Sequence, residues 1–320
     1  MSPPVVDGLQ YAAWSRAVFE EMRAGGVDAV HATICYHETF RETVARIVEW
    51  NRLFEAHDDL IVQAHDAADV DRARETGRTA IVFGSQNPSC LEDDIGLVEV
   101  LHRLGLRFLQ LSYNNQSLLA SGCYEDVDAG LTRMGREVVA EMNRVGMIVD
   151  MSHSGERSTL DAIERSARPI AVSHANPRAW HDVPRNHSDA VIAGLAETGG
   201  MLGFSLYPHH LAGGSDCTLE AFCAMVAGVA DRHGTACLGI GSDLCQGRPD
   251  AVVEWMRVGR WTKARDPEAR FPRMPSWFGS NADMPRVAAG LRATGFSADE
   301  VGAIMGGNWM RFMAAGFGPA

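Results

Sequence analysis

Eight short runs rich in β-branched and apolar residues alternate with longer segments of helical periodicity along the 320-residue chain. The expected strands span residues 3–8, 27–34, 79–86, 106–113, 146–153, 169–174, 200–207 and 237–243, and a short run at 60–65 lies outside this count. Such alternation is typical of βα units in a parallel sheet. No G-x-G-x-x-G follows the first run, as it would in an open dinucleotide-binding sheet. We therefore predict a single α/β domain over residues 1–320, folded as a (β/α)8 TIM-type barrel.

The charge and the apolar pattern of the chain argue against two classes of partner. The formal net charge is −12, whereas binding nucleic acid requires a basic face. No apolar run reaches the roughly 18 residues of a membrane span. The seven cysteines include no CxxC pair, and MSPPVVDGLQ lacks the basic and apolar regions of a secretory signal. We therefore expect a cytoplasmic protein that binds neither nucleic acid nor a membrane.

Polar side chains stand at the carboxyl ends of several expected strands, where barrel enzymes place their chemistry. They are Gln86, Tyr113, His153, His174 and Asp243. Two imidazoles on successive strands can share one divalent ion, and neutral imidazole suits zinc. A carboxylate nearby can act as a ligand or as the base that takes a proton from water. The pattern favours a metal or acid/base site at the barrel mouth, although a single strand-end histidine is more often simply packed.

Other polar residues have both a functional and a structural interpretation. Cys123 becomes a nucleophile if a histidine lies beside it, but a small buried hydrophobe is the more frequent case. His31 and His37 are candidates for the pocket wall, with a solvated loop histidine the more frequent case for each. The neighbours His209 and His210 follow an expected strand and point in different directions, so they are not expected to share a metal, whereas one of them can reach a substrate.

The Pro-, Arg- and Trp-rich segment 245–285 is expected to form a long loop over the barrel mouth or at a subunit contact. Its aromatic residues suit a lid or an interface as well as they suit ordinary packing. They are Trp255, Trp261, Trp277 and Phe278.

Short sequence motifs spread over nearly the whole chain all resemble those of one protein family. GLTRMGREVVAEMNRVGMIVDMSHSG is the most specific, and PIAVSHANPRAWHDVPRNHSD and GIGSDLCQG follow it. DGLQYAAW, GLRFLQLSYNNQ and the late GGNWMRF complete the set. Together they resemble the motifs of the renal (membrane) dipeptidase family, zinc peptidases with a barrel of the metallo-dependent hydrolase type. The resemblance implies cleavage of a peptide-like bond and, by analogy, a homodimer.

Carried over by position, the resemblance assigns roles to four residues of this chain. His153 and His174 match ligands of the family's second zinc. Arg185 matches the residue that binds the substrate carboxylate, and Asp243 matches the acid/base residue beside the metals.

The first zinc site of the family is altered in this chain. Leu9 and Tyr11 stand where the family has a metal-binding His and Asp, and Gln86 stands where it has a bridging Glu. Tyr113 replaces a histidine that polarises the substrate. Leucine cannot bind a cation, tyrosine has a reference pKa near 10, and a neutral amide is a weak zinc ligand. We therefore expect the binuclear site to be lost and at most one divalent ion, with zinc the first expectation.

Three functions are compatible with these residues. The first is hydrolysis of an amide or peptide-like bond in a small carboxylate-bearing substrate. In it Asp243 and Tyr113 are catalytic, Arg185, Asn114 and Gln86 bind substrate, and His153 and His174 bind the metal. The second is a metal-free acid/base lyase or isomerase on the same barrel. The third is a catalytically inactive homologue that binds a small ligand.

Overall fold

Parallel strands close into a barrel in the structure of the chain, a computed structural model that describes residues 2–263 and 266–318. The ring runs β1–β2–β4–β5–β6–β7–β8–β9 and returns to β1, and β3 pairs with β4 outside it. The predicted (β/α)8 barrel and the extra run at 60–65 are thus confirmed. The strands are β1 (Val6–Gln10), β2 (Ala29–Cys35), β3 (Ile61–Gln63), β4 (Thr79–Ser85), β5 (Leu106–Gln110), β6 (Ile148–Asp150), β7 (Ala171–Ala175), β8 (Met201–Phe204) and β9 (Leu238–Ile240).

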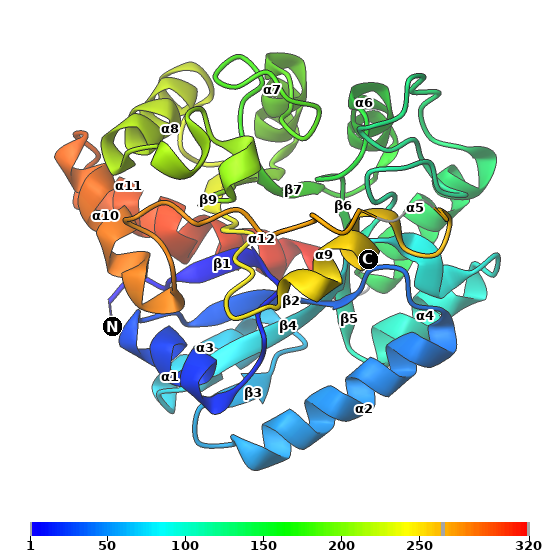
Figure 1. The fold of residues 1–320 in the computed structure, drawn as a ribbon, viewed down its shortest axis with the longest axis horizontal. Coiled ribbons are helices and arrows are strands. Elements are labelled where there is room, and N and C mark those ends of the chain that lie inside the picture. Colours follow the sequence, from blue (N-terminus) through cyan, green and yellow to red (C-terminus); the bar gives the residue numbers. More distant parts are fainter. Residues whose placement is uncertain (1, 264–265, 319–320) are drawn as a thin grey trace.

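Helices surround this ring (Figure 1). They are α1 (Arg16–Ala24), α2 (Phe40–Ala56), α3 (Ala67–Glu75), α4 (Gly96–Arg103), α5 (Arg133–Val145), α6 (Glu156–Arg165), α7 (Asp189–Thr198), α8 (Leu219–His233), α9 (Val253–Val258), α10 (Met284–Ala293), α11 (Ala298–Gly302) and α12 (Asn308–Gly316). Local sequence explains their ends: Thr132 caps α5 by accepting from Gly135 N, and Gly146, at φ +81°, stops it. No described helix combines the length and the apolar composition needed to cross a bilayer.

The strands begin and end at different residues from those expected. The first run, predicted at 3–8, becomes a strand only from Val6, because Pro3 and Pro4 have no N–H to donate. Tyr113, His153 and Asp243 were expected inside strand runs but follow the ends of β5, β6 and β9. These side chains therefore stand on loops at the barrel mouth, and of the predicted site residues His174 alone lies within a strand.

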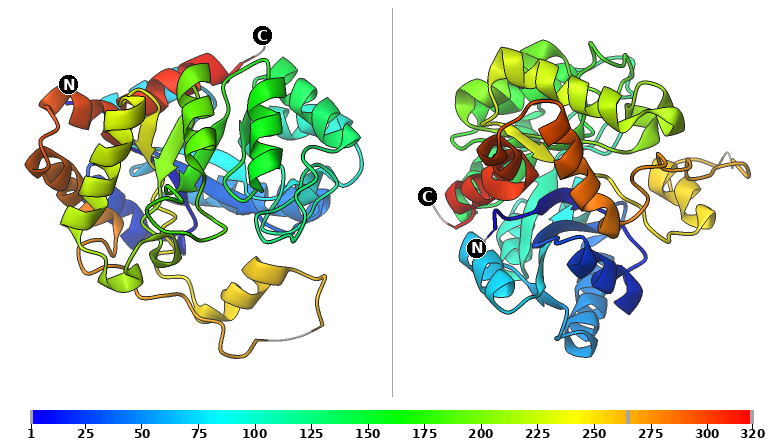
Figure 2. Two further views of the ribbon diagram at one scale, coloured as in Figure 1. Left: turned by 90° about the horizontal axis from the view of Figure 1, so that it is seen from above. Right: turned by 90° about the vertical axis from the view of Figure 1, so that its left-hand side faces the viewer.

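The segment after β9 was expected to form a long loop, but it contains the helix α9. Val253 and Met256 lie one turn apart on this helix, and Met256 packs with the buried rings of Tyr36 and Tyr113. The helix stands out from the body of the barrel, on the side opposite α12 (Figure 2, left). Its apolar residues thus cover the strand ends.

The C-terminal helix α12 closes the other end of the barrel with Trp309, which is 1% exposed. The indole N–H donates to Ile240 O at 2.9 Å. A Cβ atom added to Gly8 or Gly239 would lie 2.4 Å from the ring, so these glycines leave the space that it fills. The indole therefore plugs the base of the strand ring.

We expect Trp309→Ala to lower the free energy of unfolding by about 3–5 kcal/mol, because it empties a closed cavity and removes a buried hydrogen bond. Equilibrium urea denaturation followed by circular dichroism measures this change. Trp261→Ala is the matched control, since Trp261 is 62% exposed and should change stability by less than about 0.5 kcal/mol. Equal effects of the two substitutions would contradict the plug.

Candidate active site

Residues from separate strand ends line one cavity at the barrel mouth, with a volume of about 500 Å³. The predicted residues among its lining are Gln86, Tyr113, Asn114, His153, Arg185 and Asp243. His174 is fully buried beside them, with its Nε2 3.0 Å from Nε2 of His153. The structure therefore brings together all the residues to which the sequence assigned a role at this site.

Hydrogen bonds determine which ring nitrogen of each histidine carries the proton. His174 Nδ1 lies 2.8 Å from Ser173 Oγ, and the Ser173 hydroxyl donates its own proton to Asp150. Ser173 must therefore accept from His174 Nδ1–H, which leaves a lone pair on Nε2. His153 Nδ1 lies 2.7 Å from Asn114 Oδ1, which can only accept, so Nε2 of His153 carries a lone pair as well.

The local backbone holds both tautomers in place. Asp150, at the end of β6, accepts from the amide and the hydroxyl of Ser152 and from the amide of Ser173. The two Ser-His pairs of neighbouring strands thus share one buried carboxylate. Asn114 has φ +63°, a left-handed conformation that costs a non-glycine residue about 1 kcal/mol or more. This conformation accompanies the contact of its side-chain oxygen with His153.

Gln86 adds a third acceptor beside the two imidazoles. Its Nε2 donates to Thr33 Oγ1 and Tyr36 Oη, both at 2.8 Å, and its Oε1 lies 3.0 Å from His153 Nε2. Burial, reinforced by the charge of Arg185, holds the pKa of both histidines well below the usual value, so both rings are neutral at pH 7. The lone pairs of His153 Nε2, His174 Nε2 and Gln86 Oε1 therefore point toward one another. Such an arrangement is favourable only when a cation or a proton lies among the three atoms.

The three converging atoms fit a metal ion. Neutral imidazoles are good zinc ligands, and an amide oxygen is a weaker third one. Across residues 2–263 and 266–318, no three His, Cys, Asp or Glu side chains are grouped so that they could hold a metal ion. The donor set therefore fits one divalent ion on His153, His174 and Gln86, held without a carboxylate.

We expect Gln86→Glu to tighten binding of one divalent ion by about tenfold or more, because a carboxylate adds charge where the amide oxygen now stands. The stoichiometry should stay at one ion per chain, because Leu9 and Tyr11 supply no ligands for another. Titration with zinc, followed by calorimetry, measures both quantities. Binding of two ions by this variant, or restored cleavage of dipeptides by a binuclear site, would contradict the expectation.

Arg185 places a buried positive charge next to this cluster, with 4% of the residue exposed. It donates to Ser152 O and to His174 O, the latter at 3.2 Å, and its Nη2 lies 3.3 Å from His153 Nε2. None of the ion pairs formed among the described residues involves it. Because a buried charge without a partner is costly, Arg185 is suited to bind an anionic group of a ligand.

Asp243 faces the same cavity from the loop after β9. Its φ is +56°, and its amide donates to Leu9 O at 3.0 Å, which ties it to β1. Burial raises the pKa of its carboxyl group to about 7, although the nearby Arg185 charge opposes this shift. Such a group can both accept and return a proton near neutral pH.

An aromatic cluster stands at the end of β1, where the resemblance puts the first metal ligands. Leu9 is fully buried, and Tyr11 packs edge-on against Tyr36 with ring centroids 4.7 Å apart. The guanidinium of Arg248 lies 3.8 Å from the centre of the Tyr11 ring. The positive charge at the end of β1 thus belongs to Arg248, in a cation–π pair with Tyr11.

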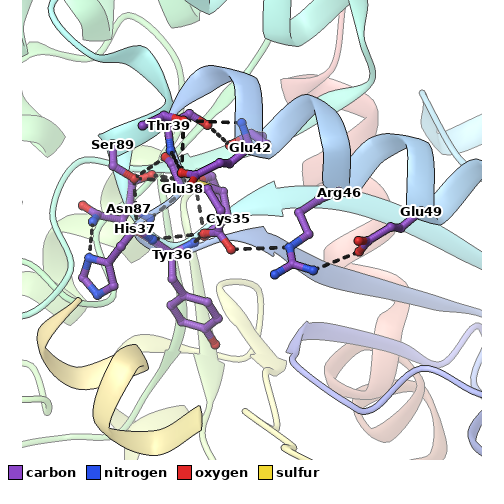
Figure 3. Close-up of polar contacts among 12 residues, drawn as sticks. Cys35, Tyr36, His37, Glu38, Thr39, Glu42, Arg46, Glu49, Asn87 and Ser89 are labelled. Carbon is purple, nitrogen blue, oxygen red and sulfur yellow. Dashed lines mark hydrogen bonds and ion pairs between the residues drawn. The ribbon is translucent and has the colours of Figure 1, made fainter. Parts of the chain in front are cut away.

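Tyr36, whose hydroxyl orients Gln86, is a site residue that the sequence reasoning missed. Figure 3 shows how Glu38 holds its loop: the carboxylate accepts from the amides of Tyr36 at 2.6 Å and His37 at 3.1 Å, and faces Arg46 at 3.5 Å. The position of Tyr36 in the sequence, two residues beyond the expected strand 27–34, could have indicated a side chain at the barrel mouth.

The structure decides between the two interpretations of several histidines. His31 is not a solvated loop residue but a buried residue of β2, stacked on Phe108 with ring centroids 4.3 Å apart. His37 is half-buried, and its Nε2 lies 3.0 Å from Met256 O, so it contacts α9 while part of the residue stays exposed. His209 is exposed and His210 is buried, and both line the same cavity at the barrel mouth.

The structure also decides between the interpretations of Cys123 and of the aromatic residues of segment 245–285. Burial raises the pKa of the Cys123 thiol, the wrong direction for a nucleophile. Trp277 and Phe278 are core residues, with Trp277 Nε1 donating to Cys217 O at 2.8 Å, so a lid or interface role is wrong for them. Trp255 packs on Tyr36, and Trp261 lines the cavity.

Comparison with known proteins identifies relatives of this arrangement. The family model described as membrane dipeptidase (peptidase family M19) matches residues 9–263. The dipeptidase tcpJ of Claviceps purpurea is 30% identical over 289 residues, which cover 89% of this chain and 61% of that protein. The dipeptidase verJ of Clonostachys rogersoniana is 31% identical over 65% of this chain and 54% of its own. The chain thus spans between half and two thirds of the length of these relatives.

Solved structures share the whole fold. An amidohydrolase from Pseudomonas aeruginosa is 34% identical, with a TM-score of 0.93 and 99% of both chains covered. A metallopeptidase from Rhodobacter sphaeroides, solved with a phosphinate mimic of the dipeptide L-Ala-D-Ala, superposes with a TM-score of 0.82 at 18% identity. At that identity the likeness is one of fold.

Proposed function

The chain belongs to the membrane dipeptidase family, and we propose that it hydrolyses an amide or peptide-like bond in a small substrate that carries a carboxylate. The observation that carries this proposal is the convergence of three lone pairs, from His153, His174 and Gln86, beside the guanidinium of Arg185, which forms no ion pair with the described residues. A site suited to a cation, formed by these three atoms, thus lies next to a site suited to an anion, formed by Arg185, in one cavity. An ion held by the three atoms would polarise the carbonyl of the bond to be cleaved.

The protein groups of the cavity supply the remaining steps. Arg185 binds the carboxylate and thereby sets the position of the amide. Asp243 takes a proton from the attacking water and returns it to the leaving nitrogen. Burial raises the pKa of Tyr113 well above its usual value, so its hydroxyl stays protonated and can donate to the developing oxyanion.

The proposal is tested by metal analysis combined with an assay. Protein purified without chelator and then dialysed against Zn²⁺ should hold about one ion per chain by elemental mass spectrometry. The same protein should cleave members of a panel of dipeptides and N-acyl amino acids. Absence of both metal and cleavage would contradict the proposal.

A metal-free acid/base reaction is a second candidate, which one contact favours. Arg185 Nη2, at 3.3 Å from His153 Nε2, offers that lone pair a donor in the absence of metal. In that case Asp243 and Tyr113 would serve a lyase or isomerase reaction. The same protein would then be active after exhaustive treatment with a chelator.

The raised pKa of Asp243 predicts a pH dependence. As a base, the carboxyl group must be ionised, and the ionised fraction falls as the pH falls below about 7. We therefore expect kcat/KM to fall as the pH falls from 8 to 5, with the limb displaced to lower pH where a bound cation favours the ionised carboxylate. A pH profile at saturating zinc measures this limb, which should be absent from the residual activity of Asp243→Asn. A flat profile in the unaltered protein would contradict the assignment.

A further inference from the structure

The charges around the cavity carry information on the substrate, given the amide hydrolysis proposed above. The lining includes one carboxylate, that of Asp243, and two guanidinium groups, those of Arg185 and Arg257. Arg257, on α9, lies 4.0 Å from Asp266 and is half-exposed, so its charge is partly compensated. Arg185 is buried and has no such partner among the described residues.

The other titratable groups of the cavity wall add no negative charge. His153 and His210 carry no negative charge, because an imidazole is neutral or positive near neutral pH. Tyr36 and Tyr113 are buried phenols, and a phenol is uncharged near neutral pH. Gln86 presents an amide oxygen, which is polar but uncharged. Asp243 is therefore the cavity's one anionic group in the described part of the chain.

This balance is unfavourable for the free α-ammonium of a dipeptide. That group is bonded to the carbon next to the carbonyl that is cleaved, so it would lie close to the cation site and to Arg185. Like charges at such separations repel strongly in a partly dehydrated cavity. Asp243 could pair with the ammonium, but it must exchange a proton during the reaction and loses its charge when it does so.

Another part of the cavity wall favours an apolar group instead. Its residues lie on α9 and in the segment that follows: Val253, Met256, Val258, Trp261 and Phe271. They stand on the part of the chain that projects over the mouth in Figure 2. A substrate held by Arg185 through its carboxylate at the cavity floor can direct its other end toward this wall.

We infer that the substrate is an N-acyl amino acid with an apolar acyl group, rather than a dipeptide with a free amino terminus. Arg185 takes the carboxylate of the amino acid, and the acyl chain lies against the apolar wall beneath α9. Hydrolysis adds water across the amide and releases a carboxylic acid and a free amino acid, with no other reactant.

A matched pair of substrates tests this inference. N-propanoyl-leucine and alanyl-leucine differ by one ammonium group on the same carbon skeleton, and each is prepared with L- and D-leucine. We expect the zinc-loaded protein to cleave the propanoyl compound with a kcat/KM about 10- to 100-fold higher, because the ammonium would be dehydrated without an anion. Equal or faster cleavage of alanyl-leucine would overturn the inference and leave the proposed hydrolysis intact.

Binding separates the inference from the proposed function. If neither compound is cleaved, tighter binding of N-propanoyl-leucine by calorimetry would support the substrate class while the hydrolysis fails. Binding of neither compound would overturn both proposals. Tighter binding of alanyl-leucine would place its ammonium among the three lone pairs of the histidine cluster and overturn the inference.

A pair of variants tests the electrostatic cause. Val258 is partly exposed on the apolar wall, so Val258→Asp adds a carboxylate there, and Val258→Asn adds a side chain of the same shape without charge. We expect Val258→Asp alone to reduce the preference for the propanoyl compound, by about tenfold. An equal reduction in Val258→Asn, or no reduction in either variant, would show that charge does not set the preference.

Discussion

Replacing His174 with alanine is expected to remove the bound divalent ion and to lower kcat/KM by about a thousandfold or more. The residue is fully buried, and its Nε2 is one of two imidazole lone pairs at the cation site. Without it, one imidazole and one amide oxygen remain, too few donors to hold zinc firmly. Loss of an ion that polarises a carbonyl costs several kcal/mol of transition-state stabilisation.

Metal content by elemental mass spectrometry and the hydrolysis assay measure the two effects of His174→Ala separately. His209→Ala is the matched control for metal content, because His209 lines the same cavity but is exposed and makes no hydrogen bond with the cluster. It should retain about one ion per chain. Retention of that ion by His174→Ala would show that His174 is not a ligand of the ion.

Replacing Arg185 with methionine is expected to lower kcat/KM for a carboxylate substrate roughly 30- to 5,000-fold, which corresponds to about 2–5 kcal/mol for one partner of a buried charge pair. Most of the loss should be in KM, because the carboxylate contact is present before and during the reaction. Arg185→Lys should recover part of it, since lysine restores the charge but not the two-pronged geometry.

A substrate whose carboxylate is converted to an amide provides the control for Arg185→Met. It lacks the anionic group, so the unaltered protein and the variant should cleave it at similar rates. Arg257→Met, on the half-exposed rim, should have a much smaller effect on the acid. If Arg185→Met impairs both substrates equally, the residue acts through its contacts with Ser152 and His174 and not through the carboxylate.

The barrel could be predicted because its signal is local. Alternating apolar runs and helical periods identified the eight strands of the ring and the short β3. The strand ends were less accurate: Tyr113, His153 and Asp243 continue apolar runs in the sequence but leave the sheet in the structure. Where a strand ends depends on the pairing of its neighbour, which the run itself does not contain.

The sequence by itself determined which chemical groups this protein has at the barrel mouth. The two Ser-His pairs, Asp243 and the neutral Gln86 follow from residue identity and from position at a strand end. Tertiary structure alone decided their state: the tautomers of His153 and His174 depend on Asn114 and Asp150, and Arg185 is a buried cation that forms no ion pair with the described residues. The physical reason is that protonation and burial are set by atoms from strands distant in the chain, such as Gln86 against His153, which sequence spacing does not encode.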